Sequence, residues 1–177
     1  MKKVALIILS LTVVCSVFAF SKGTNYLGGT ASFSSAKASS DAETLTTITL
    51  QPELGVFILD NSSLDLIFKF ISQSQGDVST SIVGVGIGTK YYWKNFYAGI
   101  DFQHQSSSVR GSHWNGTSSG MFLNPKAGYL VSLIPHAYLD LGAGYLMGIG
   151  NYGGGSGRSN ETRYLGFHIG LQYFFNE

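Results

Sequence analysis

The end of the chain, from Glu161 to Phe175, alternates between apolar residues and small or polar ones. The apolar positions are Leu165, Phe167, Ile169, Leu171, Tyr173 and Phe175, and the positions between them include Gly166, His168, Gly170 and Gln172. Because side chains on a strand point alternately to its two faces, a period of two places these sets on opposite faces. The pattern therefore predicts a strand with one apolar face and one polar face.

Seven earlier segments show the same alternation, which gives eight predicted strands. The seven are Tyr26–Phe33, Thr46–Ile58, Leu64–Ser72, Thr80–Tyr91, Phe96–Gln105, Ser119–Val131 and Ala137–Ile149. Most are close to the ~9–11 residues that a tilted strand needs to cross a bilayer. The predicted connections are short at Leu59–Ser63, Tyr92–Asn95 and Ser132–His136, and longer at Ser34–Leu45, Gln73–Ser79, Ser106–Ser118 and Gly150–Asn160. Short turns alternating with long loops are typical of outer-membrane barrels, whose short turns are periplasmic.

Composition indicates which face of these strands is outside. Charged residues make up 12% of the chain, against about 25% in a typical soluble domain. The polar face consists mostly of Gly, Ser, Thr, Gln and Asn, whereas a face exposed to water should carry frequent Lys and Glu. We therefore expect an all-β, eight-stranded antiparallel up-and-down transmembrane β-barrel with its apolar face toward lipid. A soluble barrel or sandwich with its apolar face inward is the alternative.

The beginning of the chain has the features of an export signal. Lys2 and Lys3 precede an apolar stretch from Val4 to Val17, and Val17-Phe-Ala19 offers a signal-peptidase site. We expect residues 1–19 to be a cleaved signal peptide and residues 20–177 to form a single barrel domain. A retained anchor and a lipoprotein attached at Cys15 are less favoured alternatives, the second because the residue before this cysteine is not small.

The final strand also resembles the C-terminal β-signal by which Gram-negative outer-membrane barrels are recognised for assembly. That signal requires a polar residue, a glycine, a hydrophobic residue and a terminal aromatic residue, and these correspond to His168, Gly170, Tyr173 and Phe175. The departure is that two residues, Asn176 and Glu177, follow the aromatic position. The resemblance implies the barrel assembly machinery as a partner.

Other segments resemble the outer membrane protein A-like and opacity-protein superfamily of small barrels. They are Tyr26–Ser35, Leu50–Phe57, Asn95–Ile100 and Ala137–Tyr145. The resemblance implies eight antiparallel strands, a plugged or narrow lumen, and contact with outer-membrane lipid and lipopolysaccharide. We expect a monomer with a non-enzymatic structural, surface-interaction or adhesion role. A narrow small-solute pore or a lipid-binding barrel is the alternative, and an enzyme acting on lipid A is a weaker one.

Seven charged residues fall on the inward, polar face of the predicted strands. They are Glu53, Asp65, Lys69, Lys90, Asp101, Lys126 and Asp140. An eight-stranded barrel is just wide enough for side chains to fill, and buried charges persist when they are paired. We therefore expect all three lysines to pair with the acids and to block the lumen. A selective pore or a proton path is the alternative.

Two other candidate sites carry weak signals. His104 and Ser106 resemble part of the His-x-Ser-Asn motif of lipid A deacylases, but Ser107 replaces the asparagine and no acid is evident, so we expect no catalytic site. The histidines, including His113 and His136, lack metal-ligand spacing, and the sequence shows no basic patch for nucleic acid. We expect neither cofactor nor metal. An aromatic girdle at the short-turn rim is predicted for Tyr91, Tyr92, Trp93 and Phe96.

Overall fold

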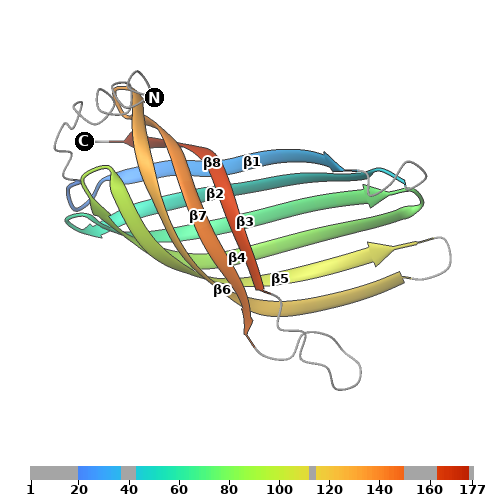
Figure 1. The fold of residues 1–177 in the computed structure, drawn as a ribbon. Coiled ribbons are helices and arrows are strands. Elements are labelled where there is room, and N and C mark those ends of the chain that lie inside the picture. The colour runs from blue at the N-terminus through green and yellow to red at the C-terminus, as the bar shows by residue number, and fades with distance from the viewer. Residues whose placement is uncertain (1–19, 37–42, 112–114, 150–162, 176–177) are drawn as a thin grey trace.

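A computed structural model describes residues 20–36, 43–111, 115–149 and 163–175, which form a closed barrel of eight strands in sequence order (Figure 1). The strands are β1 (Asn25–Ala36), β2 (Leu45–Leu59), β3 (Ser62–Gln75), β4 (Val78–Trp93), β5 (Phe96–Arg110), β6 (Asn115–Ile134), β7 (Ala137–Ile149) and β8 (Arg163–Phe175). Each strand pairs antiparallel with its neighbours, and β1 also pairs with β8. The predicted all-β, eight-stranded fold is confirmed. Of the described residues, none forms a helix long and apolar enough to cross a membrane.

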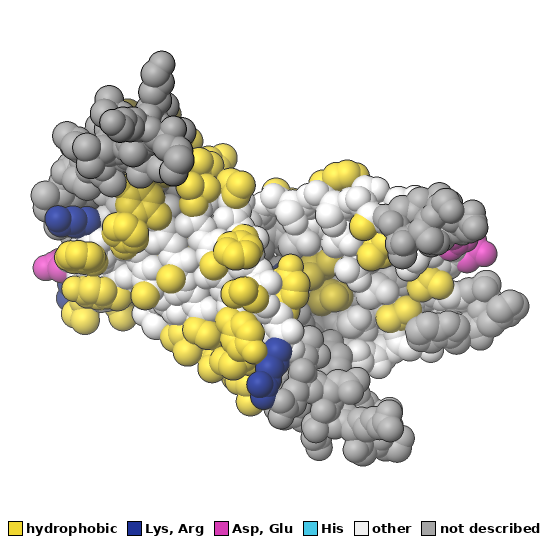
Figure 2. Space-filling view, in the orientation of Figure 1, with side chains coloured by type: hydrophobic (Ala, Val, Ile, Leu, Met, Phe, Trp, Pro, Cys, Tyr) yellow, Lys and Arg dark blue, Asp and Glu magenta, His cyan; other side chains and the backbone are white. Residues whose placement is uncertain are grey.

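Apolar side chains cover the outside of the barrel. Ile87 on β4 is 59% exposed and Phe167 on β8 is 84% exposed, whereas Ile67 and Phe174, which point inward, are fully buried. Figure 2 shows hydrophobic side chains spread over the outer surface with few charged groups in view. Such a surface is stable only against lipid, because monomeric soluble proteins rarely expose large contiguous apolar areas. The apolar face is therefore outside, and the soluble alternative is excluded.

Three short turns join strands at the end of the barrel that carries the start of β1 and the end of β8, called here the short-turn end. The turns contain Asn61, Lys94 and His136, whose φ angles are 61°, 56° and 66°. Two-residue hairpin turns favour positive φ because their twist then matches that of the strands. The opposite end of the barrel is called the long-loop end.

The predicted loop at Gln73–Ser79 is wrong. β3 and β4 continue through this region to the pair Gln75↔Val78, and only Gly76 and Asp77 form the turn. Glycine fits this place because its φ is 53°. Beyond the apolar face, the strands thus continue with residues that carry hydroxyl and amide side chains. The loop was predicted because these residue types are also common in loops.

Strands β5 and β6 are also longer than predicted. Their pairing runs to Arg110↔Asn115, so most of the predicted loop Ser106–Ser118 is a paired hairpin. The outward residues of this extension are polar, namely serines, a threonine, Arg110 and Asn115, instead of apolar, which places it beyond the apolar belt. The predicted long loop at Gly150–Asn160 and the predicted signal peptide lie outside the described residues, as does half of the first predicted loop, residues 37–42.

Aromatic side chains fill the lumen at the short-turn end. The cluster comprises Phe20, Tyr26, Phe57, Tyr92, Tyr97, Leu130, Tyr138 and Phe174. Phe20 stacks between Phe57 and Phe174, with ring centroids 5.0 and 4.4 Å away. The predicted girdle needs one correction, because Tyr92 is 1% exposed and points into this cluster while its neighbours Tyr91 and Trp93 point outward.

The seam between β1 and β8 closes over only part of its length. Pairing runs from Asn25↔Phe175 to Thr30↔Gly170 and then ends. Beyond that point, β1 from Ala31 to Ala36 pairs only with β2, and β8 from Arg163 to Ile169 pairs only with β7. Figure 1 shows the two strands diverging toward the long-loop end. The barrel is therefore continuous at the short-turn end and open along one side above it.

Candidate functional site

A network of ion pairs crosses the lumen directly above the aromatic cluster. Glu53 on β2 lies at its centre and forms ion pairs with Lys90 and Lys126, the second at 3.2 Å. Lys126 Nζ also lies 2.8 Å from Asp101 Oδ1, so this lysine bridges two carboxylates. Asn124 Nδ2 donates to the other oxygen of Asp101 at 3.1 Å. Strands on opposite sides of the barrel are thereby connected through its interior.

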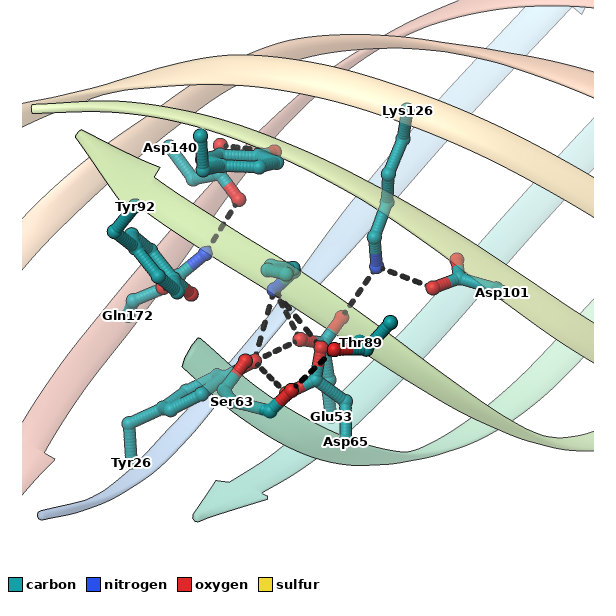
Figure 3. A network of polar contacts seen from close by, with 12 residues as sticks. Tyr26, Glu53, Ser63, Asp65, Thr89, Tyr92, Asp101, Lys126, Asp140 and Gln172 are labelled. Atoms are coloured by element: carbon teal, nitrogen blue, oxygen red, sulfur yellow. Dashed lines mark hydrogen bonds and ion pairs between the residues drawn. The ribbon is translucent and has the colours of Figure 1, made fainter. Parts of the chain in front are cut away.

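Tyr26 extends this network toward β1. Its hydroxyl group donates to Asp65 Oδ1 at 2.7 Å and also contacts Glu53, while Lys90 Nζ donates to the tyrosine oxygen at 2.9 Å. Lys90 Nζ lies 3.9 Å from Asp65 Oδ2 as well. Figure 3 shows Tyr26, Glu53 and Asp65 converging on one point in the lumen. Two acids are therefore held by one lysine and one phenol.

Asp140 forms a second polar cluster on the β7–β8 side of the lumen. One carboxylate oxygen accepts a hydrogen bond from the Tyr97 hydroxyl at 2.8 Å, and the other accepts from Gln172 Nε2 at 2.7 Å. His168 Nε2 lies 3.0 Å from the Tyr97 oxygen and 3.5 Å from Asp140 Oδ1. Together with the first network, this cluster spans the lumen from β1 to β8.

Glycines on the inward face make room for these large side chains. A Cβ atom at Gly86 would lie 2.7 Å from Gln103 Cγ, and one at Gly142 would lie 2.9 Å from the Tyr97 oxygen. Such distances are shorter than van der Waals contact, so neither position accepts a side chain without movement. The glycine-rich inner face predicted from sequence is thus the complement of the polar residues that occupy the lumen.

The lumen charges do not all pair as expected. Six of the seven, all except Lys69, belong to the two clusters described above. Lys69 forms no ion pair with any residue that the structure describes; it is half-buried and lines a cavity nearer the long-loop end. On β3 it lies four residues beyond Asp65, about 13 Å along the strand, which is too far for contact. The expectation that all three lysines are paired is therefore wrong for Lys69.

That cavity, called here the cup, occupies the long-loop half of the lumen. Its volume is about 940 Å³. Glu53, Lys90, Lys126 and Asp140 are at its floor, and the walls carry Gln51, Gln73, Gln103, Gln105 and other polar residues. Apolar residues also line it, and its edge includes residues of β1 and β8 on both sides of the open seam. The site is a cup with a mixed polar and apolar lining, closed below by ion pairs and aromatic rings.

The residues of the β-signal divide between the two faces of β8. His168 and Gly170 face the lumen, whereas Tyr173 and Phe175 point outward, with ring centroids 4.9 Å apart, at the short-turn end. The two aromatic residues therefore lie side by side on the surface that neighbouring lipid or protein would meet. Their role in assembly stays a prediction.

The weak catalytic candidate finds no support in its surroundings. His104 and Ser106 are exposed on the outside of β5, where they pair in the ladder with Val85, Met121 and other belt residues. No carboxylate hydrogen-bonds to either of them among the residues that the structure describes. The same described residues contain no group of three or more metal-ligating side chains.

Sequence reasoning missed Tyr26, Tyr97 and Tyr92 as members of the lumen network. All three lie at inward positions of their strands, one residue away from outward apolar neighbours. The alternation of inward and outward positions along each strand assigns these tyrosines to the inside. They were overlooked because the inward residues were expected to be polar, and tyrosine is aromatic. The tyrosine hydroxyl explains their place, since it joins the apolar cluster below to Asp65 and Glu53 at Tyr26, to Asp140 at Tyr97, and to the Gln172 amide at Tyr92.

Comparison with known proteins finds similar folds among solved structures. No family model and no curated protein sequence matches the chain. Among solved structures, the N-terminal β-barrel domain of Pseudomonas aeruginosa OprF matches with a TM-score of 0.57 and 10% identity, covering 87% of this chain and 98% of that one. Neisserial surface protein A matches with a TM-score of 0.54 and 15% identity over 87% and 98% of the two chains. Ail, the attachment invasion locus protein of Yersinia pestis, matches with 0.53 and 12% over 87% and 99%.

These likenesses agree with the expected outer membrane protein A-like and opacity-type architecture at the level of fold. The apolar belt of this chain supplies the independent observation that its barrel faces lipid. By fold and by lipid-facing surface, the chain is a small outer-membrane β-barrel.

Proposed function

We propose that this protein is a non-enzymatic outer-membrane barrel that does not conduct, and that it presents its cup and hairpins to the outside in a surface-interaction role. One observation carries the proposal: two successive layers of side chains occlude the lumen. The ion-pair network spans it at the level of Glu53, and the aromatic cluster around Phe20 fills it below.

The occlusion argues against a pore for small solutes. Lys90 is 2% exposed and Asp101 is fully buried, so little water reaches the centre of the network. A solute would have to separate these buried pairs and then displace the stacked rings of Phe20 and Phe174. Breaking one buried pair typically costs about 3–5 kcal/mol, which makes a permanently open path incompatible with this interior.

The outside of the barrel supports a surface role better than an enzymatic one. The outward histidine and serine on β5 have no acid to orient them among the residues that the structure describes, whereas catalytic pairs of this kind need a third group. Beyond the belt, the β3–β4 and β5–β6 hairpins extend as paired strands with polar side chains on both faces. Ordered hairpins of this kind provide a defined surface for contact outside the membrane.

Electrical recording in planar bilayers tests the closed lumen. We expect the purified protein to give no steady channel steps under conditions in which a general porin conducts. A stable ohmic conductance in every insertion would overturn the proposal and favour the pore.

Cell labelling tests which end faces outward. A cysteine at Asp77, in the β3–β4 turn, should react with a membrane-impermeant maleimide on intact cells, and one at Lys94, in a turn at the other end, should not. If the proposal is right, deleting the gene should also change adherence of the cells while leaving uptake of small hydrophilic antibiotics unchanged. The reverse pattern in either measurement would contradict it.

A further inference from the structure

The open part of the β1–β8 seam forms a lateral opening into the cup, bounded by Ala31–Ala36 and Arg163–Ile169. Residues from both edges line the cavity, among them Ser32, Phe33, Phe167 and His168. In the orientation shared by Figures 1 and 2, the surface recedes between β8 and the strands of the long-loop half, and hydrophobic atoms are visible at the bottom of the hollow. The cup therefore communicates with the side of the barrel as well as with its end.

The outer flanks of this opening belong to the apolar belt. Phe33 on β1 is 69% exposed, Phe167 and Ile169 on β8 are 84% and 66% exposed, and the row on β8 continues through Leu171 to Tyr173. An apolar band on such a barrel is about 25 Å tall, and the outward row of β8 from Leu165 to Phe175, eleven residues tilted at about 45°, spans a similar height. The opening thus faces hydrocarbon for at least part of its length.

A gap at that depth needs a partner that is both polar and apolar. Unpaired backbone groups exposed to lipid cost several kcal/mol each, so open sheet edges do not occur there unless they line a wet cavity or are covered. Pure hydrocarbon would leave these edges without hydrogen bonds, and pure water would contact the apolar flanks. Water in the cup can hydrogen-bond the edges from the inside, and an apolar chain lying between the flanks covers the outside, so a molecule with a polar head in the cup and an apolar chain in the opening fits this place.

The inside of the cup has the same mixed character. Ile71 and Ile82, paired on β3 and β4, project into it together with Phe122 and Leu146. Lys69 lies beside them, half-buried and without an ion pair among the described residues. A partly desolvated cation next to apolar side chains favours an anionic group that arrives with its own hydrocarbon.

We propose that the cup binds a membrane-derived amphiphile with one anionic head group and one hydrocarbon chain, of fatty-acid type, which enters through the lateral opening. The head group lies at Lys69, and the chain passes between Phe33 and Phe167 into the leaflet on the long-loop side. This deepens the proposed function by naming a ligand class for the cup and rests on the lumen being closed below. Conductance tests the closure separately, so failure of one proposal is distinguishable from failure of the other.

Photo-crosslinking tests the site directly. The protein is placed in nanodiscs of phosphatidylcholine with a diazirine-bearing fatty acid, irradiated, and mapped by mass spectrometry. We expect crosslinks at the flanks of the opening and at Ile71, with competition by excess laurate but not by acetate. Crosslinks spread evenly around the belt, including Val85 and Ile87 on β4, would show annular lipid only and overturn the proposal. Crosslinked pairs of protein chains joined at β1 and β8 would show that a second copy covers the seam, and would overturn it too.

A matched pair of lysine variants tests the head group. Lys69→Met should lower the crosslinking yield by roughly tenfold, because it removes a charge-assisted contact. Lys94→Met, an equal change of charge at a turn of the opposite end, should leave the yield unchanged. Heat-dependent gel mobility reports whether each variant is folded. A folded Lys69→Met protein that captures the probe as well as the wild type would overturn the assignment.

Closing the seam tests the route of entry. Continuing the pairing beyond Thr30↔Gly170 would set Phe33 opposite Phe167, the two residues between which the chain passes, and antiparallel partners are close enough for a disulfide. In the double variant Phe33→Cys/Phe167→Cys, oxidation should abolish crosslinking in the cup and reduction should restore it on the same sample. Undiminished capture at Ile71 in the oxidised protein would show that the lateral opening is not the path.

Discussion

At the short-turn end, every strand is paired on both sides and side chains fill the lumen, whereas at the long-loop end β1 and β8 separate around a cavity. Both halves are built from the same alternating strands. They differ in what points inward: below, large aromatic and charged groups satisfy one another, whereas above, polar and apolar side chains are mixed and Lys69 has no ion pair among the described residues. Closure of the wall and filling of the lumen therefore occur together in this barrel.

The largest expected difference between the two halves is in the rate of backbone amide hydrogen exchange. Amides of β1 that face the open seam between Ala31 and Ala36 should exchange at least about a hundredfold faster than those between Asn25 and Thr30, because open edges exchange without unfolding of the barrel. β8 should show the same step at Gly170. Uniform protection along both strands in nanodiscs would mean that the seam is closed in the membrane.

Removing a charge from the filled half should cost far more stability than removing one from the cup. Lys90→Met leaves Glu53 and Asp65 without their shared cation, and we expect a loss of about 3–5 kcal/mol in the free energy of unfolding. Lys69→Met should change it by less than about 0.5 kcal/mol, as for substitutions that break no pair. Equilibrium urea unfolding in micelles gives both values. Equal losses would show that the cup lysine has a structural partner.

Tyrosine hydroxyl groups allow a finer test of the same difference. Tyr97→Phe removes the hydrogen bond to Asp140 and the contact with His168, and should destabilise the barrel by about 1–2 kcal/mol. Tyr91→Phe makes the same chemical change at an exposed position on the outside and should be nearly silent. The expectation fails if the two variants unfold at the same urea concentration.

The smallest effect on stability is expected for an outward aromatic residue at the closed end. Phe175→Ala should change unfolding by less than about 1 kcal/mol, since the side chain is partly exposed, while Phe174→Ala, which opens the aromatic cluster, should cost about 3 kcal/mol. If Phe175 acts in the assembly signal, its variant should nevertheless yield less folded barrel in the outer membrane. Unchanged yield, measured by heat-dependent mobility of membrane fractions, would remove the evidence for that role.

Much of this architecture follows from the alternation of apolar and polar residues alone. The period of two predicts the strands and assigns each charged residue to the inner face, because that assignment depends only on neighbouring residues. Pairing across the lumen depends instead on the stagger between strands. Lys69 shares a face with Asp65 but lies two inward positions farther along, and Asp101 pairs with Gly88 while Lys69 pairs with Gly84. No local sequence pattern predicts this offset between strands.

The open seam was equally beyond reach of the sequence. Residues on both sides of it continue the same alternation, so nothing local marks Thr30 or Gly170 as the last pair. The prediction of a loop between β3 and β4 was wrong for a different reason. Beyond the belt, the residues of these strands are polar and have the composition of a loop. The error at the β3–β4 connection arises where the bilayer no longer dictates which residue types face outward.

The stacking of Phe20 between Phe57 and Phe174 also constrains the order of events during biogenesis. One partner comes from the beginning of the described chain and another from its end, so the cluster cannot be completed before the last strand has docked. Contacts between such distant segments form late, because the entropy of loop closure must be overcome first. A partly inserted barrel would therefore keep an unsealed interior, and the barrier to leakage would be established only in the final step of assembly.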